Sequence, residues 1–225
     1  MIVPDEISRS SRRTVSLTVM KNGAVVVKAP LRMTDAEIDH FVESKQNWIK
    51  TKLCAVTNTL SKYQDIINYE KVMVYGSKYT ILLAATNKIE IDDENQLIFP
   101  KKTVPEKRLK ALKTWYKKFA KRILENRISM LADKYKFKFS TFKITDSKGR
   151  WGSCNSRGVI CINFRVIMLP PAIIDYILVH ELCHLTEMNH SRRFWEQVMA
   201  IYPATKAARA GLKEYGFLLD LYKKS

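Results

Sequence analysis

Residues 171–195 read PAIIDYILVHELCHLTEMNHSRRFW, and this stretch decides the expected fold. Its first nine residues are mostly apolar and follow Pro170, which favours a buried helix that begins near that proline. Within it, His180-Glu181-Leu182-Cys183-His184 has the pattern H-E-x-x-H. Residues four apart lie on one face of a helix, so both imidazoles can reach one ion, while Glu181 lies about 100° around the helix. The stretch therefore predicts a helix that carries a metal site.

The H-E-x-x-H pattern is typical of zinc-dependent hydrolysis. Zinc lowers the pKa of its water, and the carboxylate accepts a proton as that water attacks a carbonyl and then passes it to the leaving amine. With 4 histidines in 225 residues, chance predicts only roughly 0.004 matches to this pattern. The alternative, two helical histidines that are hydrogen-bonded inside a core, is disfavoured because a third histidine follows closely.

That third histidine, His190, is the best candidate for the third protein ligand that a catalytic zinc needs beside an open position. A continued helix would put His190 about 280° from His180, so the chain must turn between His184 and His190. We expect Asn189 to end the helix in the left-handed conformation and Ser191 to cap the next helix. The rival third ligands are acidic: Glu187, Glu196 and Glu214.

The spacing of ten residues from His180 to His190 is that of the metzincin pattern H-E-x-x-H-x-x-G-x-x-H. Glu187 stands where that pattern has glycine, and Met199 lies in an expected helix rather than in a Met-turn. The match to metzincins is therefore one of spacing alone.

The N-terminal hundred residues predict a small β-rich α+β region without recognisable chemistry. Asn22-Gly23 between β-branched runs predicts a hairpin, and Thr34 with Glu37 forms a capping box that starts a helix reaching Leu53. A polar linker is expected near residues 58–65, followed by strands at 72–75, 78–84, 88–91 and 96–99. Further on, strands are expected at 141–145 and 159–164, separated by a loop.

The positive charge is concentrated in one part of the chain. The net charge is +17, and residues 101–150 hold 17 basic and 4 acidic residues, or +13. Apolar residues recur at helical spacing from Pro105 to about Tyr135, with most cations on the other face: Lys107, Arg108, Lys110, Lys113, Lys117, Lys118, Lys121 and Arg122. Such a ridge is either a solvated helix face or a contact for nucleic acid or another polyanion.

Composition and cysteine usage exclude several protein classes. A chain with 46% hydrophobic and 27% charged residues can bury a core, which excludes wholesale disorder. Its longest apolar stretches fall far short of the ~20 residues that cross a bilayer, so we expect no membrane association. The N-terminus shows no secretory h-region, which predicts a cytoplasmic location. The four cysteines are widely and irregularly spaced and are expected to be reduced thiols.

Several of these motifs together resemble the YgjP-like zinc metallopeptidases. The resemblance covers nearly the whole chain and is most specific in RWGSC (150–154), VHELCHL (179–185) and NHSRRFW (189–195). It implies an α+β, zincin-like metallopeptidase domain over residues 101–225 with the basic helix leading, preceded by the β-rich region 1–100. It also implies one zinc ion held by His180, His184 and His190, with Glu181 as the catalytic acid and base. A looser similarity to SprT-type proteases, which act on proteins bound to DNA, offers a purpose for the basic helix.

Residues around the expected site leave alternatives open. Strand 159–164 is expected to bind an extended peptide by strand addition. Arg150 and Trp151 either face the substrate or form a packed turn, and Cys183 is expected to pack in the core. The candidates for stabilising the oxyanion are Tyr202, Tyr215 and Arg157. A non-enzymatic alternative is a nucleic-acid-binding module with a structural zinc, which would require Cys154 or Cys183 to complete the ligand set.

Overall fold

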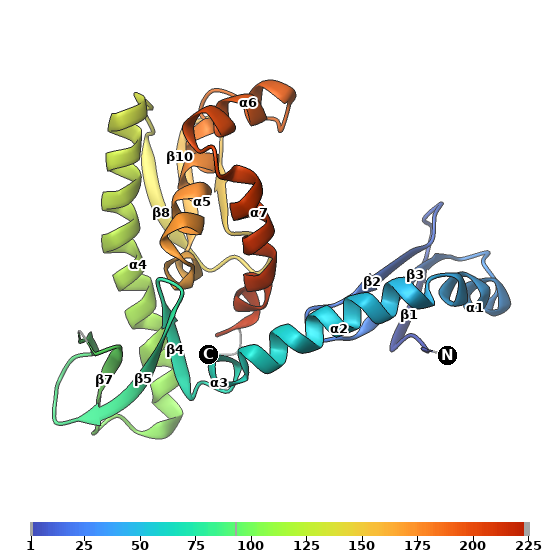
Figure 1. Ribbon diagram of the computed structural model, residues 1–225, viewed down its shortest axis with the longest axis horizontal. Coiled ribbons are helices and arrows are strands. Elements are labelled where there is room, and N and C mark those ends of the chain that lie inside the picture. Colours follow the sequence, from blue (N-terminus) through green and yellow to red (C-terminus); the bar gives the residue numbers. More distant parts are fainter. Residues whose placement is uncertain (1, 93, 223–225) are drawn as a thin grey trace. The chain divides into compact units, whose positions relative to one another are not determined.

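The computed structural model describes residues 2–92 and 94–222 of the chain (Figure 1). The chain forms two compact units, Met1–Ile67 and Asn68–Ser225. The division expected near residue 100 therefore differs from the observed one, because the strands of residues 71–100 belong to the second unit. Overall the fold is α+β, with a β-rich N-terminal region.

The first unit packs a three-stranded sheet against helices. Its strands are β1 (Glu6–Ser10), β2 (Ser16–Val19) and β3 (Val25–Pro30), in the order β1-β3-β2. The pair β2–β3 is antiparallel, and Gly23 in the turn between them has φ +88°, which glycine adopts without strain. The predicted hairpin is thereby confirmed. The core holds Val25, Val27, Ala29, Ile38, Val42 and Ile49.

The helices of this unit match the prediction at their start but not at their end. The capping box is present at the start of α1 (Asp35–Ser44), where the Glu37 N–H donates to Thr34 and the Thr34 N–H donates back to the Glu37 carboxylate. The helix predicted to reach Leu53 is two helices, since α1 ends before Lys45 and α2 spans Gln46–Lys62. The polar linker predicted near 58–65 is wrong: α2 and the short α3 (Gln64–Ile67) occupy most of it. Polar residues can occupy the exposed face of a helix, and the Thr59 hydroxyl donates a hydrogen bond to the Ala55 carbonyl within α2.

The second unit contains two small sheets and the long helices. One sheet, ordered β4-β5-β7-β6, comprises β4 (Lys71–Val74), β5 (Ser77–Ala84), β6 (Glu90–Ile91) and β7 (Gln96–Pro100). The other, ordered β8-β10-β9, comprises β8 (Thr141–Thr145), β9 (Gly152–Cys154) and β10 (Val159–Asn163). The helical elements are α4 (Pro105–Tyr135), η1 (Phe164–Met168), α5 (Pro171–Cys183), α6 (Arg192–Ile201), α7 (Thr205–Glu214) and η2 (Tyr215–Asp220).

Helix α4 has the predicted bounds and runs beside β8 and α5 (Figure 1). Its buried face includes Leu112, Leu124 and Ile128. The buried Tyr116 hydroxyl donates to the Met73 carbonyl of β4 at 2.8 Å. This bond joins the long helix to the first sheet of the unit.

Not every cation of α4 faces solvent. The Nζ atoms of Lys113 and Lys117 each lie 3.2 Å from Asp146, whose other oxygen lies 2.7 Å from the buried Arg165. Burial would raise the pKa of Asp146, but the hydrogen bonds from Arg165 and Lys113 outweigh it and lower the pKa to about 2. Arg165 also donates to the Leu221 carbonyl. Two of the lysines expected on the outer face therefore join α4 to Asp146, which follows β8.

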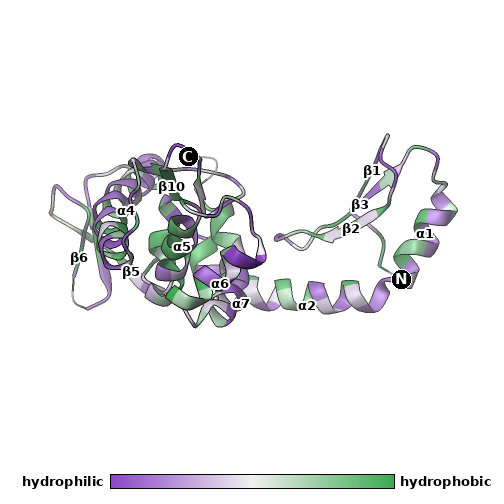
Figure 2. Cartoon of the chain, turned by 90° about the horizontal axis from the view of Figure 1, so that it is seen from above, coloured by the Kyte–Doolittle hydropathy of each residue, from purple (hydrophilic) through white to green (hydrophobic). Residues whose placement is uncertain are grey.

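Figure 2 shows hydrophobic residues along most of α5, in keeping with the burial of nine of its side chains. Within the described residues, no helix is long and apolar enough to cross a membrane.

Candidate metal centre

Helix α5 presents His180 and Glu181 from its last turn, and His184 is its C-cap residue. The helix contacts α4, α6, α7 and β9. This packing on all sides explains why the segment is apolar throughout rather than along a single stripe. Glu181 and His184 are only 5% and 8% exposed. These two polar residues are buried because they belong to an otherwise apolar segment that packs inside the unit.

The chain turns between His184 and His190, as the spacing requires. Glu187 N–H donates to the Cys183 carbonyl at 3.0 Å, which closes the turn after the helix. The expectation of a left-handed Asn189 is wrong, since Asn189 is absent from the described residues with positive φ. The Ser191 hydroxyl accepts from Phe194 N–H at 3.3 Å and starts α6, as predicted.

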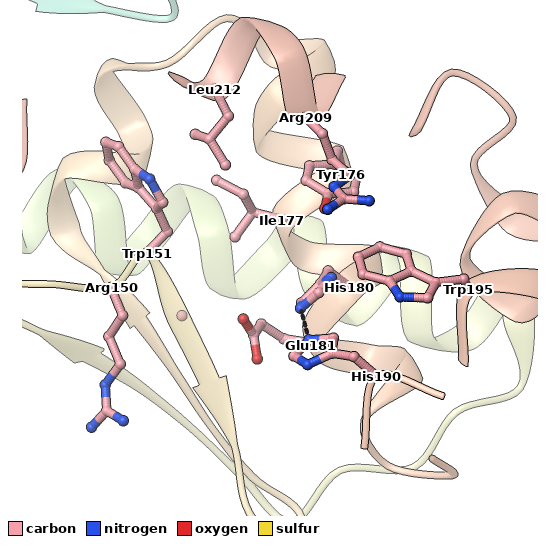
Figure 3. A pocket seen from close by; sticks show the side chains of 11 residues that line it. Arg150, Trp151, Tyr176, Ile177, His180, Glu181, His190, Trp195, Arg209 and Leu212 are labelled. Atoms are coloured by element: carbon pink, nitrogen blue, oxygen red, sulfur yellow. Dashed lines mark hydrogen bonds between the residues drawn. The ribbon is translucent and has the colours of Figure 1, made fainter. Parts of the chain in front are cut away.

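The three histidines converge on one point. One ring nitrogen from each of His180, His184 and His190 lies within 4.8 Å of the other two, and the Nε2 atoms of His180 and His190 are 3.0 Å apart (Figure 3). Nδ1 of His184 lies 3.0 Å from the Glu187 carbonyl. Donation by that Nδ1–H leaves Nε2 of His184 as the lone-pair nitrogen that can bind a metal.

Two aromatic residues at the start of α6 hold the imidazoles in place. Phe194, fully buried, stacks on His184 with centroids 4.5 Å apart and rings inclined by 24°. Trp195 stacks on His190 at 5.6 Å and 23°. Phe194 and Trp195 therefore restrict the orientation of two candidate ligands.

The electrostatics of the centre favour neutral imidazoles. Burial, followed by the proximity of His184 and His190, lowers the pKa of His180 to about 3. Burial also lowers the pKa of His184. Neutral imidazole is the metal-binding form of histidine, so no proton has to leave these two rings at pH 7. Burial raises the pKa of Glu181 to about 8, with Arg150 opposing the shift.

The residues present fit a bound metal ion. His180 Nδ1 and Glu181 Oε2 are buried without a hydrogen-bond partner in the described part of the chain, and buried polar atoms are seldom left so. The described cluster contains the three histidines and none of the rivals Glu187, Glu196 or Glu214. Three imidazoles with an open fourth position are a donor set of catalytic zinc.

Neither of the two cysteines considered as ligands joins the cluster among the described residues. Burial raises the pKa of Cys154 to about 11 and that of Cys183 to about 12, and metal ligation needs the thiolate. Cys183 is fully buried, as expected of a packing residue. All four cysteines are free thiols.

Comparison with known proteins agrees with this geometry. The sequence profile of the YgjP-like metallopeptidase domain matches residues 13–215. The chain belongs to the YgjP-like metallopeptidase family. Among solved structures, the metallopeptidase zymogen of Pyrococcus abyssi abylysin is 26% identical over 40% of this chain and 93% of that one, with a TM-score of 0.36. A search of curated proteins finds no match.

In this YgjP-like metallopeptidase, a hollow of about 470 Å³ opens beside the histidines (Figure 3). Gly152 of β9 lies directly against Glu181, because a Cβ atom at Gly152 would fall 2.5 Å from Glu181 Oε1. Trp151 is half-buried and lines the hollow, so it is not a core residue. The RWGSC motif thus borders the site, although sequence reasoning left it out of the catalytic residues.

The hollow also contains residues that sequence reasoning did not single out. Tyr176 lies one turn before His180 on α5, and Arg209 reaches in from α7 with its guanidinium 4.2 Å from the Trp195 ring centroid. The i−4 spacing of Tyr176 from His180 could have revealed the first residue. Nothing in the sequence relates Arg209 to the motif, because only the tertiary packing of α7 on α5 brings it there.

The three oxyanion candidates lie elsewhere in the described structure. The Tyr202 hydroxyl donates to the Ala172 carbonyl at 2.7 Å, and Arg157 lines a separate hollow near Ser140. Tyr215 opens η2. None of the three lines the hollow at the histidines, as far as the described residues go.

The strand expected to bind an extended peptide does not lie at an edge of its sheet. β10 (Val159–Asn163) is the central strand, paired with β8 on one side and β9 on the other, so it has no open edge. The expectation of strand addition at 159–164 is therefore wrong. The edge strands of this sheet are β8 and β9, and β9 is the one that lies against Glu181. The sequence predicts a loop at β9, because three residues with a glycine give no strand signal.

Proposed function

We infer that this YgjP-like metallopeptidase is a zinc-dependent endopeptidase in which His180, His184 and His190 hold the ion and Glu181 moves the proton. The observation that carries the proposal is the convergence of three ring nitrogens within 4.8 Å beside the partnerless Oε2 of Glu181. Three imidazoles leave a coordination position open, which a structural zinc would not.

The chain supplies a base of suitable strength next to this position. When bound, zinc provides Lewis acidity that brings the pKa of a water molecule close to neutral. Burial raises the pKa of Glu181 to about 8 without a metal ion, and a cation bound beside it lowers that pKa again, so that the ionised form is present at neutral pH. The Glu181 carboxylate would then take the proton from the attacking water and return it to the leaving amide nitrogen. Its burial keeps the carboxylate away from competing solvent hydrogen bonds.

The substrate chain would bind along β9. Asn163 N–H donates to the Trp151 carbonyl and Asn155 N–H to the Val159 carbonyl, so odd-numbered residues of β9 bond to β10. In an antiparallel ladder the alternate residues turn their N–H and C=O groups to the other side. Gly152 and Cys154 therefore offer main-chain groups at the open edge beside Glu181, and binding there has little sequence preference.

Tyr176 and Arg209 are our candidates for polarising the substrate carbonyl. Both line the hollow, and the electrostatic influence of Arg209 opposes the raised pKa that burial gives Tyr176. A phenol or guanidinium that donates to the developing oxyanion stabilises the transition state more than the bound substrate. Arg150, which is exposed at the rim, would help to orient the substrate.

The experiment is cleavage of an unfolded protein such as reduced casein, with zinc measured per chain. Glu181→Gln should keep its zinc and lose activity by at least about 100-fold, the usual worth of a general base. His190→Ala should lose zinc, while His40→Ala, which removes an exposed histidine of α1, should keep it. Full activity of Glu181→Gln would overturn the mechanism, and unchanged zinc in His190→Ala would overturn the ligand set.

A further inference from the structure

The surface of α4 carries a pair of stacked aromatic rings away from the metal centre. Trp115 and Phe119 have ring centroids 5.0 Å apart and planes inclined by only 8°. Both side chains are half-buried. Tyr75 meets the edge of Phe119 at 6.2 Å, and the Arg122 guanidinium lies over the Phe119 ring at 5.6 Å. These contacts hold the two rings in a fixed orientation.

The rings form one wall of a hollow of about 540 Å³. The lining also contains two aliphatic residues, Ile91 in strand β6 and Ile89 just before it. Lys118 and Arg122 contribute two cations to the lining and Glu90 contributes one carboxylate. A slot with aromatic and aliphatic walls and a positive rim has the dimensions and chemistry to receive a planar, anionic ligand.

The charge around this slot is available for a partner. Lys113 and Lys117 are engaged with Asp146, and Arg127 is paired with Asp175. By contrast, Lys118 and Arg122 are exposed, and no carboxylate of the described residues lies within ion-pair distance of either. The segment 101–150 holds +13 of the net charge of +17. Lys118 and Arg122 are therefore two cations of this segment that lie beside the rings and are open to a partner.

We propose that Trp115, Phe119, Lys118 and Arg122 form a binding site for single-stranded nucleic acid. An unstacked base would lie on the aromatic pair while Lys118 and Arg122 contact the flanking phosphates, the combination by which proteins hold single strands. The bases of a duplex are stacked on one another, so none of their faces can reach the rings. The carboxylates of an acidic peptide would pair with the cations and would not stack on the rings. The site narrows the contact expected for helix 105–135 to about two turns of α4. It does not depend on the zinc or on hydrolysis.

The first test is fluorescence anisotropy of a labelled 20-nucleotide oligothymidine with the full-length protein at about 100 mM salt. Trp115→Ala should weaken binding at least tenfold, and Trp115→Phe should restore most of it because a ring remains. The matched control is Trp48→Ala, since Trp48 is 42% exposed and also has a lysine, Lys52, over its ring at 5.9 Å. Binding that is absent in the wild type, or equally weakened by Trp48→Ala, would overturn the proposal.

The second test separates the site from diffuse charge. Arg122→Gln and Lys121→Gln each remove one exposed cation of α4, but only Arg122 lines the slot. Arg122→Gln should weaken binding at least fivefold and make the slope of log Kd against log salt smaller, whereas Lys121→Gln should change affinity less than twofold. Equal losses, duplex binding as tight as single-strand binding, or displacement by polyglutamate at equal charge would each overturn the proposal, the last in favour of an acidic protein partner.

Discussion

Gly152 lies so close to Glu181 that the site leaves no room for a side chain at this position. It lies in the RWGSC motif, and the position of its missing Cβ is occupied by the Glu181 carboxylate. Only glycine lets β9 approach α5 this closely. A second glycine of the same loop, Gly149, has open space around its Cβ position. A side chain is therefore excluded at Gly152 but has room at Gly149, three residues earlier.

We predict that Gly152→Ala lowers peptidase activity at least tenfold, because the new methyl group displaces the Glu181 carboxylate and a 1 Å misplacement of a catalytic group is costly. Gly149→Ala is the matched control and should keep activity within about twofold. The measurement is casein turnover with zinc content and thermal midpoint recorded for both variants. A Gly152→Ala enzyme as active as the wild type would show that Glu181 is not confined by β9.

At the scale of the element, the caps decide where helices start, and one of them starts next to a candidate ligand. Ser191 caps α6 immediately after His190, so the loss of its hydroxyl frees the end of the helix that carries Phe194 and Trp195. Thr34 caps α1 in the first unit with the same kind of bond.

Replacement of either cap by alanine should cost about 1 kcal/mol of stability. We predict that Ser191→Ala also weakens zinc affinity several-fold, because the aromatic contacts to His184 and His190 loosen with the first turn of α6. Thr34→Ala should leave zinc affinity unchanged. Competition with a chromogenic chelator measures both, and equal zinc affinity in the two variants would contradict the coupling of the cap to the site.

The elements that the sequence predicts best are those with a strong local signal. Asn22-Gly23, Thr34 with Glu37, and the apolar spacing of 105–135 each specify a structure within a few residues, and all three were confirmed. The failures have a tertiary cause. β9 exists only because β10 pairs with it, and Arg209 reaches the hollow only because α7 packs on α5. The break between α1 and α2 at Lys45 could not be predicted, because no proline or glycine lies there in the sequence.

The H-E-x-x-H spacing made two members of the histidine cluster predictable, since it brings two rings together on any helix. The aromatic supports were harder to predict, because Phe194 and Trp195 have ordinary helical spacing and only their position after the turn aims them at imidazoles. The pairing of Lys113 and Lys117 with Asp146 could not be predicted, because Asp146 is about thirty residues away in the sequence.

At the scale of the whole molecule, Asp146 joins α4 to η1 and to the chain around Leu221 through its bonds to the lysines and Arg165. Its pKa falls from 3.8 to about 2 on folding. A lowered folded-state pKa contributes stability that is present above the unfolded pKa and lost as the pH falls through the folded one.

We therefore predict that Asp146→Asn lowers the free energy of unfolding by roughly 1.5–3 kcal/mol at pH 7, the range for hydrogen bonds to charged groups. The difference from the wild type should shrink as the pH falls from about 4 towards 2. Urea titrations across this range measure it, with Glu196→Gln as the control because the Glu196–Arg192 pair is largely exposed. A difference that does not vary with pH would contradict the role of the charge.

Each unit also has buried hydrophobic residues of its own, and those of the first unit form a cluster centred on residues 25–49. We predict that a chain of residues 68–225 folds and binds zinc as tightly as the whole protein. Circular dichroism melting and zinc titration of that fragment test this prediction. A fragment that is unfolded with zinc present would show that the second unit needs the first.

The open edge of β9 has a consequence for which proteins would be cut. A chain that adds to this edge must first give up its own main-chain pairing over several residues, so a well-folded protein would have to unfold locally before it could bind. The free energy of that local opening, rather than the identity of the side chains, would then set the rate of cleavage. Such an enzyme would distinguish damaged or unassembled proteins from intact ones by their lower local stability, and it would not need to recognise a particular sequence.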